Sequence, residues 1–148
     1  MKEPGGATIE DDMNATDGTT KTVSVMIVDD QLPFRAVART VIGLTAGFVV
    51  AAEAESGEDA VAIAAVQRPD LVLMDINLPG INGIEATRRI LSEQPDVAVI
   101  LLSTYSEADL PADARDCGAI AYVHKEDFGP ALVRDLWMQH RGGRAQAG

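Results

Sequence analysis

The stretch LVLMDINLPG, residues 71–80, decides the fold class of this chain. Four apolar residues lead directly into Asp75, and the chain then breaks at Leu78-Pro79-Gly80. A short, continuous apolar run that ends at turn residues is typical of a strand buried on both faces of a sheet. A carboxylate at the end of such a strand needs an explanation, and the rest of the sequence indicates what that explanation is.

Apolar runs alternate with helical patterns on both sides of this stretch. The sequence predicts strands at residues 23–28, 48–54, 71–75, 97–103 and 119–125. It predicts helices at 33–45, 57–67 and 83–94, a short helix near 110–117, and a last helix at 129–141. Strict alternation predicts an α/β fold, with a doubly wound five-stranded parallel sheet and helices on both faces.

Three of the predicted helices carry local signals worth testing. In the first, Phe34, Val37, Val41 and Leu44 share one face and are expected to pack inward. The stretch SGED, residues 56–59, resembles a capping box that opens the second. In the fourth, Pro111 is tolerated only within a first turn, so this helix is expected to start near Leu110 and to be short.

The two ends of the chain are expected to differ from the region between them. Residues 1–22 are rich in Gly, Thr, Asp and Glu with little to bury, which predicts a disordered tail. Residues 142–148 are expected to be a flexible tail, which leaves residues 23–141 as a single domain.

Composition excludes several classes of function. A net charge of −11 argues against direct nucleic-acid binding, which needs basic patches. Cys117 is the only cysteine, so neither a disulfide framework nor a cysteine-based zinc site is expected. No apolar run approaches the length of a membrane span, and no signal-peptide pattern opens the chain. We therefore expect a cytoplasmic protein without membrane insertion.

Polar residues lie at the carboxyl ends of four of the five predicted strands. These are Asp29-Asp30, Asp75, Ser103-Thr104 and Lys125. Each alone could be a turn former or a helix cap. In a parallel sheet, however, the carboxyl ends of the strands lie along one edge, where open α/β sheets bind ligands.

The convergence of these residues suggests a chemistry. Crowded carboxylates raise one another's pKa unless a cation lies among them, and their hard oxygens suit Mg²⁺. A carboxylate nucleophile, a metal ion and a lysine are suited to phosphoryl transfer onto an aspartate, where catalysis is mostly positioning and charge neutralisation.

Four motifs together resemble one known family. VDD (28–30), LMDINLPGINGIE (73–85), LLST (101–104) and GAIAYVHK (118–125) are similar to motifs of the receiver domain of two-component response regulators, the CheY-like fold. The resemblance covers residues 23–140. It implies the strand order 2-1-3-4-5.

The resemblance also implies roles for individual residues. Asp75 would be the phosphoacceptor, and Lys125 the lysine that assists it. Mg²⁺ would be bound by Asp30, Asp75 and the main-chain carbonyl of Asn77, with Asp29 acting through water. Ser103 would be the switch hydroxyl, and Tyr122 the aromatic residue that moves with it.

The implied partners are a sensor histidine kinase or a histidine phosphotransfer protein, together with an unknown downstream protein. A phosphorylation-dependent homodimer is a further possibility that the resemblance raises. Glu126 follows Lys125 where such domains often carry a proline, so no cis peptide is expected there. The chain shows no output domain after the receiver region, and we expect a stand-alone receiver.

Two alternatives remain open at the level of sequence. One is a protein-interaction module that works without phosphorylation and keeps the acidic site as a relic. The other is a phosphohydrolase with an aspartate nucleophile, because Asp75-Ile76-Asn77 loosely resembles a D-x-D signature. Multiple turnover on phosphomonoesters would distinguish the second.

Overall fold

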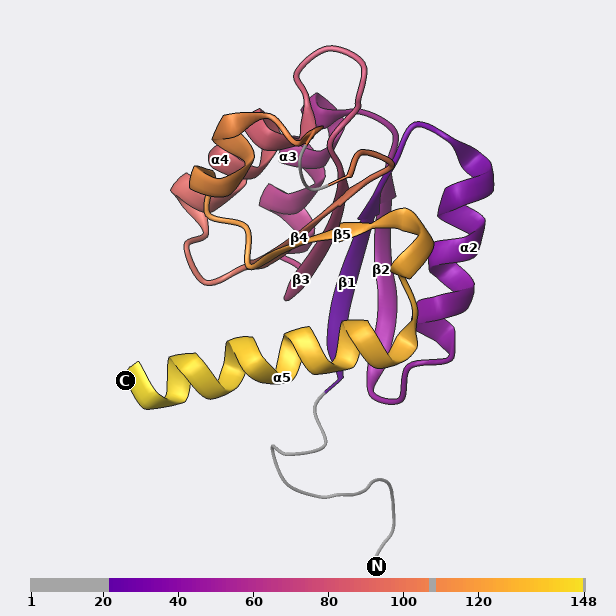
Figure 1. Ribbon diagram of the computed structural model, residues 1–148. Coiled ribbons are helices and arrows are strands. Elements are labelled where there is room, and N and C mark those ends of the chain that lie inside the picture. Colours follow the sequence, from indigo (N-terminus) through magenta and orange to yellow (C-terminus); the bar gives the residue numbers. More distant parts are fainter. Residues whose placement is uncertain (1–21, 107–108, 148) are drawn as a thin grey trace, which may run out of the picture.

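The computed structural model describes residues 22–106 and 109–147, and it contains one five-stranded parallel sheet (Figure 1). The strands are β1 (Val23–Val28), β2 (Phe48–Ala54), β3 (Leu71–Asp75), β4 (Ala98–Ser103) and β5 (Ala121–His124). Their order in the sheet is β2-β1-β3-β4-β5, as the sequence predicts. β3 is therefore the central strand, with β1 and β4 as its neighbours.

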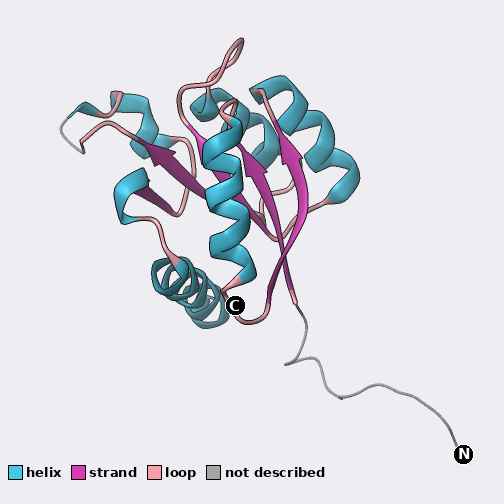
Figure 2. Ribbon diagram, turned by 90° about the vertical axis from the view of Figure 1, so that its right-hand side faces the viewer, coloured by secondary structure: helices cyan, strands magenta, loops and turns pink. Residues whose placement is uncertain are grey.

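Helices cover both faces of the sheet (Figure 2). They are α2 (Leu32–Gly43), α3 (Gly57–Gln67), α4 (Gly83–Glu93) and α5 (Pro130–Ala147), with short 3-10 helices η3 (Ala112–Asp116) and η4 (Lys125–Asp127). One apolar cluster joins the sheet to α3, α4 and η3, and a second joins it to α2 and α5. The fold is therefore a three-layer sandwich.

The pleat of the central strand divides its side chains between the two clusters. Leu71 and Leu73 belong to the cluster under α2 and α5, whereas Val72 and Met74 belong to the cluster under α3 and α4. Because successive side chains in a strand point to opposite faces, a strand covered on both sides has to be apolar throughout. This explains the run that precedes Asp75.

Local capping signals agree with the helix boundaries. The hydroxyl of Ser56 accepts a hydrogen bond from the Asp59 N–H at 3.1 Å, which confirms the cap expected for α3. Asn82 caps α4 in the same way, since its side chain accepts from the Glu85 N–H at 2.9 Å. These caps fix where the helices start after β2 and β3.

The inward face of α2 differs from the prediction. Val37 is 51% exposed and Leu44 is 71% exposed, so two of the four residues expected to be buried are not. The buried face comprises Arg35, Ala38, Val41 and Ile42. The prediction was wrong because an arginine occupies a core-facing position, where its guanidinium is hydrogen-bonded rather than solvated.

The boundaries of the helices and strands differ from the prediction less than the buried face of α2 does. The fourth helix is the 3-10 helix η3, and Pro111 lies at its N-cap position. β5 is shorter than the expected 119–125, and α5 continues to Ala147, past the expected end near Arg141. Most of the N-terminal tail expected at 1–22 lies outside the described residues. Within them, no helix combines the length and apolar character that crossing a membrane requires.

Gly83 provides a test of how tightly α4 packs on the end of β3. A Cβ atom at this position would overlap the carbonyl oxygen of Asp75 and approach the Met74 side chain. We expect Gly83→Ala to lower the free energy of unfolding by about 3 kcal/mol, because backbone cannot give way cheaply in a packed core.

Urea denaturation followed by circular dichroism measures this effect. Gly43→Ala is the matched control, since a Cβ there meets nothing within 4 Å. It should leave stability unchanged or raise it by up to about 1 kcal/mol. Equal stability of the two variants would contradict the packing described here.

Candidate functional site

Three carboxylates meet at the carboxyl edge of the sheet. Asp29 and Asp30 follow β1, and Asp75 ends β3, the strand beside it. Each offers one oxygen, and these oxygens lie within 4.8 Å of one another. Asp29 is 1% exposed and Asp75 5% exposed, whereas Asp30 is exposed to solvent. The structure thus brings together the acidic residues that the strand-end pattern selects.

Hydrogen bonds hold these carboxylates in place. The Gln31 N–H donates to Asp29 Oδ1 at 2.8 Å, and the Gln31 side-chain amide donates to Asp30 Oδ2 at 3.2 Å. The Asn77 N–H donates to Asp75 Oδ1 at 3.3 Å. The Arg35 guanidinium donates to the Asp29 carbonyl oxygen at 2.8 Å and so fixes the turn after β1. The acidic residues are therefore presented by an ordered backbone.

Lys125 extends into this cluster from the start of η4. Its ammonium lies 2.7 Å from Asp29 Oδ2 and 3.6 Å from Asp75 Oδ2. Only 16% of the side chain is exposed. One ammonium against three carboxylates leaves an excess of negative charge, so the cluster still favours a further cation.

The electrostatics single out Asp75. Burial raises the pKa of its carboxyl from an ordinary 3.8 to about 6, and the charge of Asp29 acts in the same direction. Lys125 and the Asn77 N–H oppose this shift without cancelling it. A divalent cation among these hard oxygens would offset the repulsion, so the donor set fits Mg²⁺, which prefers few carboxylates and several waters.

Ser103 ends β4 beside the acidic cluster. It is buried, and its Oγ accepts a hydrogen bond from the Tyr105 N–H at 2.8 Å. That bond leaves the hydroxyl hydrogen free to donate elsewhere. The Tyr105 hydroxyl in turn donates to Asn77 Oδ1 at 3.3 Å, which links the loops after β3 and β4.

Tyr122 lies in β5 and lines the same hollow as Ser103. This hollow has a volume of about 480 Å³, and Leu110 and His124 also line it. Tyr122 is half-buried against the core, and the Arg115 guanidinium lies 5.5 Å from its ring centroid. Free space therefore exists between Ser103 and Tyr122 into which a side chain could move.

Asn77 is placed only in part by these contacts. Its N–H bonds Asp75 and its side chain bonds Tyr105, so it borders the acidic cluster. The main-chain carbonyl that the family resemblance assigns to metal binding enters none of the contacts above. That role stays a prediction.

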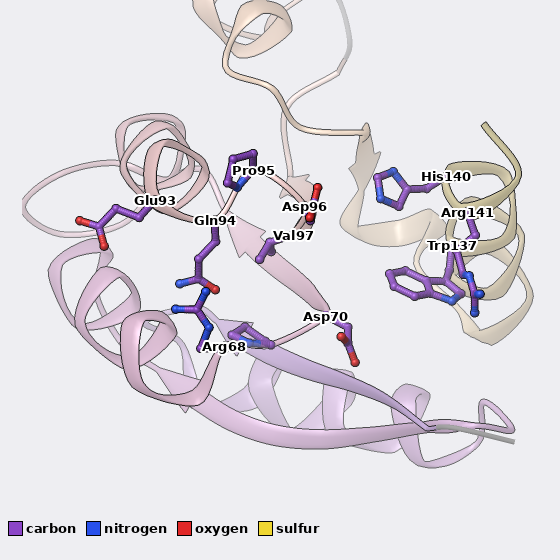
Figure 3. Close-up of a pocket in the computed structure, with 11 residues that line it drawn as sticks. Arg68, Asp70, Glu93, Gln94, Pro95, Asp96, Val97, Trp137, His140 and Arg141 are labelled. Carbon is purple, nitrogen blue, oxygen red and sulfur yellow. The ribbon is translucent and has the colours of Figure 1, made fainter. Parts of the chain in front are cut away.

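A larger hollow, about 600 Å³, lies at the opposite edge of the sheet (Figure 3). Its walls come from the loops before β3 and β4 and from α5, and its charges are mixed, with Arg68, Glu93 and Arg141 among them. The Asp70 carboxylate there is already bonded by the Ser24 N–H and hydroxyl, at 2.9 and 3.1 Å. A larger volume alone does not identify a functional site, so we take the cluster of carboxylates at the acidic edge as the candidate site.

Three further residues at the acidic edge were not selected from the sequence: Phe34, Arg35 and Tyr105. Phe34 was interpreted only as core, although its ring also contacts the Lys125 ammonium. Arg35 directly follows it and gave no strand-end signal. The position of Tyr105, two residues after Ser103, was the only available pointer to its bond with Asn77.

The raised pKa of Asp75 predicts a pH-dependent cost to stability. Between pH 3.8 and about 6 the folded chain retains a proton that the unfolded chain releases. Stability from this group is therefore lost as pH rises through 6, by at most about 3 kcal/mol. In metal-free buffer, Asp75→Asn should thus be more stable than wild type at pH 7.

Urea denaturation with a chelator present, at pH 7 and near pH 4, measures the difference between the two proteins. The advantage of Asp75→Asn should shrink on acidification, because wild-type Asp75 is then protonated. An advantage that stays constant, or that grows toward pH 4, would contradict this account of the carboxyl.

The model of the response regulator receiver domain matches residues 25–136. The chain is 41% identical over 122 residues to the response regulator UvrY of Escherichia coli (strain K12), covering 82% of this chain and 56% of that protein. It is 35% identical over 121 residues to the transcriptional regulatory protein DegU of Brevibacillus brevis, covering 82% and 51%. The chain spans about half the length of these curated relatives.

Solved structures agree with this match. A LuxR-family two-component response regulator from Aurantimonas sp. SI85-9A1 superposes with a TM-score of 0.73 at 32% identity, covering 82% of this chain and 87% of that one. The response regulator domain of Thermotoga maritima CheB gives 0.73 at 27% identity, covering 82% and 98%. A CheY-like receiver domain protein from Methanospirillum hungatei JF-1, at 20% identity and 0.73, shares the fold. The chain therefore belongs to the response regulator receiver domain family of two-component systems.

Proposed function

We propose that Asp75 accepts a phosphoryl group from a phosphohistidine on a sensor histidine kinase or a histidine phosphotransfer protein. The observation that carries this proposal is the meeting of Asp29, Asp30 and Asp75 within 4.8 Å, with the Lys125 ammonium beside them. Receiver domains as a class are partnered by such proteins.

The transfer is an in-line displacement. An oxygen of the Asp75 carboxylate attacks the phosphorus, a P–O bond forms, and the P–N bond to the donor imidazole breaks with its electron pair leaving on nitrogen. A pKa of about 6 leaves Asp75 ionised, and hence nucleophilic, at neutral pH. Lys125 contributes an ammonium that can donate to a phosphoryl oxygen.

The negative charge of the reacting groups needs neutralisation. Asp30, Asp75 and the Asn77 carbonyl would hold Mg²⁺, with Asp29 acting through water. When bound, the ion would supply charge neutralisation and orient the phosphoryl oxygens. The cluster is suited to this because two of its carboxylates are buried and hydrogen-bonded in fixed positions.

The proposed switch follows from the surroundings of Ser103. Its hydroxyl hydrogen is free to donate to a phosphoryl oxygen on Asp75, and Tyr122 lines the hollow beside it. Movement of the hydroxyl toward Asp75 would let Tyr122 turn inward and reshape the surface around η3, β5 and α5. That surface would then favour a different partner, either a downstream protein or a second copy of the chain.

Acetyl phosphate and Mg²⁺ test the proposal without the cognate kinase. We expect wild type to gain one phosphoryl group by intact-mass measurement, in a linkage that is stable to acid and cleaved by base. Asp75→Asn should gain none. Asp59→Asn, an exposed carboxylate in the first turn of α3, is the matched control and should react as wild type does.

Chelation of the metal completes this test. Excess chelator should abolish the adduct in wild type, because Lys125 alone then offsets the negative charge of three carboxylates and an incoming phosphoryl group. An adduct that persists in Asp75→Asn would overturn the assignment of the phosphoacceptor. Repeated turnover of phosphomonoesters would favour the phosphohydrolase alternative, and equal partner affinity of wild type and Asp75→Asn would favour the phosphorylation-independent one.

A further inference from the structure

The ring of Phe34 completes the environment of the Lys125 ammonium. The ammonium nitrogen lies 4.4 Å from the ring centroid, in addition to its contacts with Asp29 at 2.7 Å and Asp75 at 3.6 Å. A cation at this distance over an aromatic face is attracted by the ring quadrupole, and more strongly when water is excluded. The largely buried Lys125 side chain meets that condition.

A lysine at this position needs more than two carboxylates to hold it. Its ammonium is a point charge on a flexible four-carbon stem, and it carries no directional fork of the arginine type. The ammonium lies 2.7 Å from Asp29 and 3.6 Å from Asp75, and with these two contacts alone it would be drawn further toward Asp29. A ring face gives a third contact that attracts the cation without consuming a carboxylate oxygen.

The ring itself is fixed from two directions. Phe34 lies in the first turn of α2, where its N–H donates to the Gln31 carbonyl at 3.1 Å. Gln31 in turn bonds Asp29. On the other side, the Phe128 ring lies with its centroid 5.8 Å away, tilted by 46°.

Phe128 directly follows η4, the short helix that Lys125 begins, and its N–H donates to the Lys125 carbonyl at 3.4 Å. The ring pair thus joins the segment that carries the acidic residues to the segment that carries the lysine. Two segments that are far apart in sequence are therefore held next to each other at the site.

We propose that Phe34 is a positioning residue of the phosphoacceptor site, whose ring holds the Lys125 ammonium between Asp29 and Asp75. This inference rests on the proposed function for its effect on the reaction. The competing interpretation is that Phe34 only fills the core, because it also packs against the cluster under α2 and α5. The two interpretations differ in what happens to Lys125 when the ring is removed.

Three variants separate them. Phe34→Leu removes the ring and keeps an apolar side chain, and Phe34→Tyr keeps the ring. Phe48→Leu is the matched control, because the Phe48 ring packs on Trp137 at 6.3 Å, at the opposite edge of the sheet. With acetyl phosphate and Mg²⁺, we expect phosphorylation of Phe34→Leu to be roughly three- to tenfold slower than that of wild type. Phe34→Tyr and Phe48→Leu should react at close to the wild-type rate.

A second readout does not depend on phosphorylation. The ε-methylene group of Lys125 is bonded to the ammonium nitrogen that lies 4.4 Å from the Phe34 ring centroid, so we expect the ring current to displace its proton NMR signals upfield in the metal-free protein. The displacement should disappear in Phe34→Leu and remain in Phe34→Tyr and Phe48→Leu. A change in overall stability alone would not produce this pattern.

The outcomes for Phe34 and for the proposed function can be told apart. Wild-type kinetics in Phe34→Leu, or Lys125 signals that are not displaced in wild type, would overturn the role of Phe34 while Asp75 still reacts. Equal slowing in Phe34→Leu and Phe48→Leu would also overturn it. If wild type forms no adduct, the proposed function fails, and the Lys125 signals then decide alone whether the ring holds the lysine.

Discussion

The mutual repulsion of Asp29, Asp30 and Asp75 is the constraint on which the rest of the structure depends. Oxygens of three carboxylates within 4.8 Å destabilise one another, and burial of two of them adds to that cost. This burial and this repulsion are the reason that the pKa of Asp75 is raised. A fold keeps such an arrangement only if its scaffold is rigid and a cation can relieve the charge. Lys125 supplies part of that relief.

The scaffold meets this need through its central strand. β3 is buried along its whole length, and Gly83 lets α4 begin directly against the backbone at its end. The Gly83 N–H also donates to the Ile76 carbonyl at 2.9 Å, which fixes the turn after Asp75. The apolar run 71–74 therefore holds the Asp75 carboxylate in a fixed position, which its proposed role as phosphoacceptor requires.

Much of the fold and of the candidate site was predictable from the sequence, for physical reasons. Continuous apolar runs and alternation specify a parallel sheet, and a parallel sheet places its strand ends on one edge, so Asp29, Asp75 and Lys125 could be grouped in advance. The features that the sequence did not predict depend on contacts between segments that are separate in the chain. Arg35 is buried because its guanidinium meets the Asp29 carbonyl and Glu53, at 2.8 and 3.1 Å, which no helical period reveals.

The contact of Phe34 with Lys125 is hidden for the same reason, since Phe34 lies in α2 and Lys125 in η4, far apart in sequence, and each has an ordinary local role. The length of α5 was underestimated on other grounds. Glycine is a weak helix former rather than an absolute breaker, and α5 continues through Gly142 to Ala147. Residue patterns thus locate the groups at the strand ends, whereas Phe34 and Arg35, which support those groups from α2, are recognised only in the folded chain.

The location of the proposed cation site at the strand-end carboxylates can be measured directly. Mn²⁺ can replace Mg²⁺ as a paramagnetic probe, and it broadens the amide NMR signals of residues that lie near it. We predict that substoichiometric Mn²⁺ first broadens the signals of residues 29–31 and 75–77, that excess Mg²⁺ restores them, and that Asp30→Asn weakens the effect. Selective broadening at the opposite edge of the sheet, around residues 93–97, or uniform broadening over the acidic surface, would show that these carboxylates do not form the cation site.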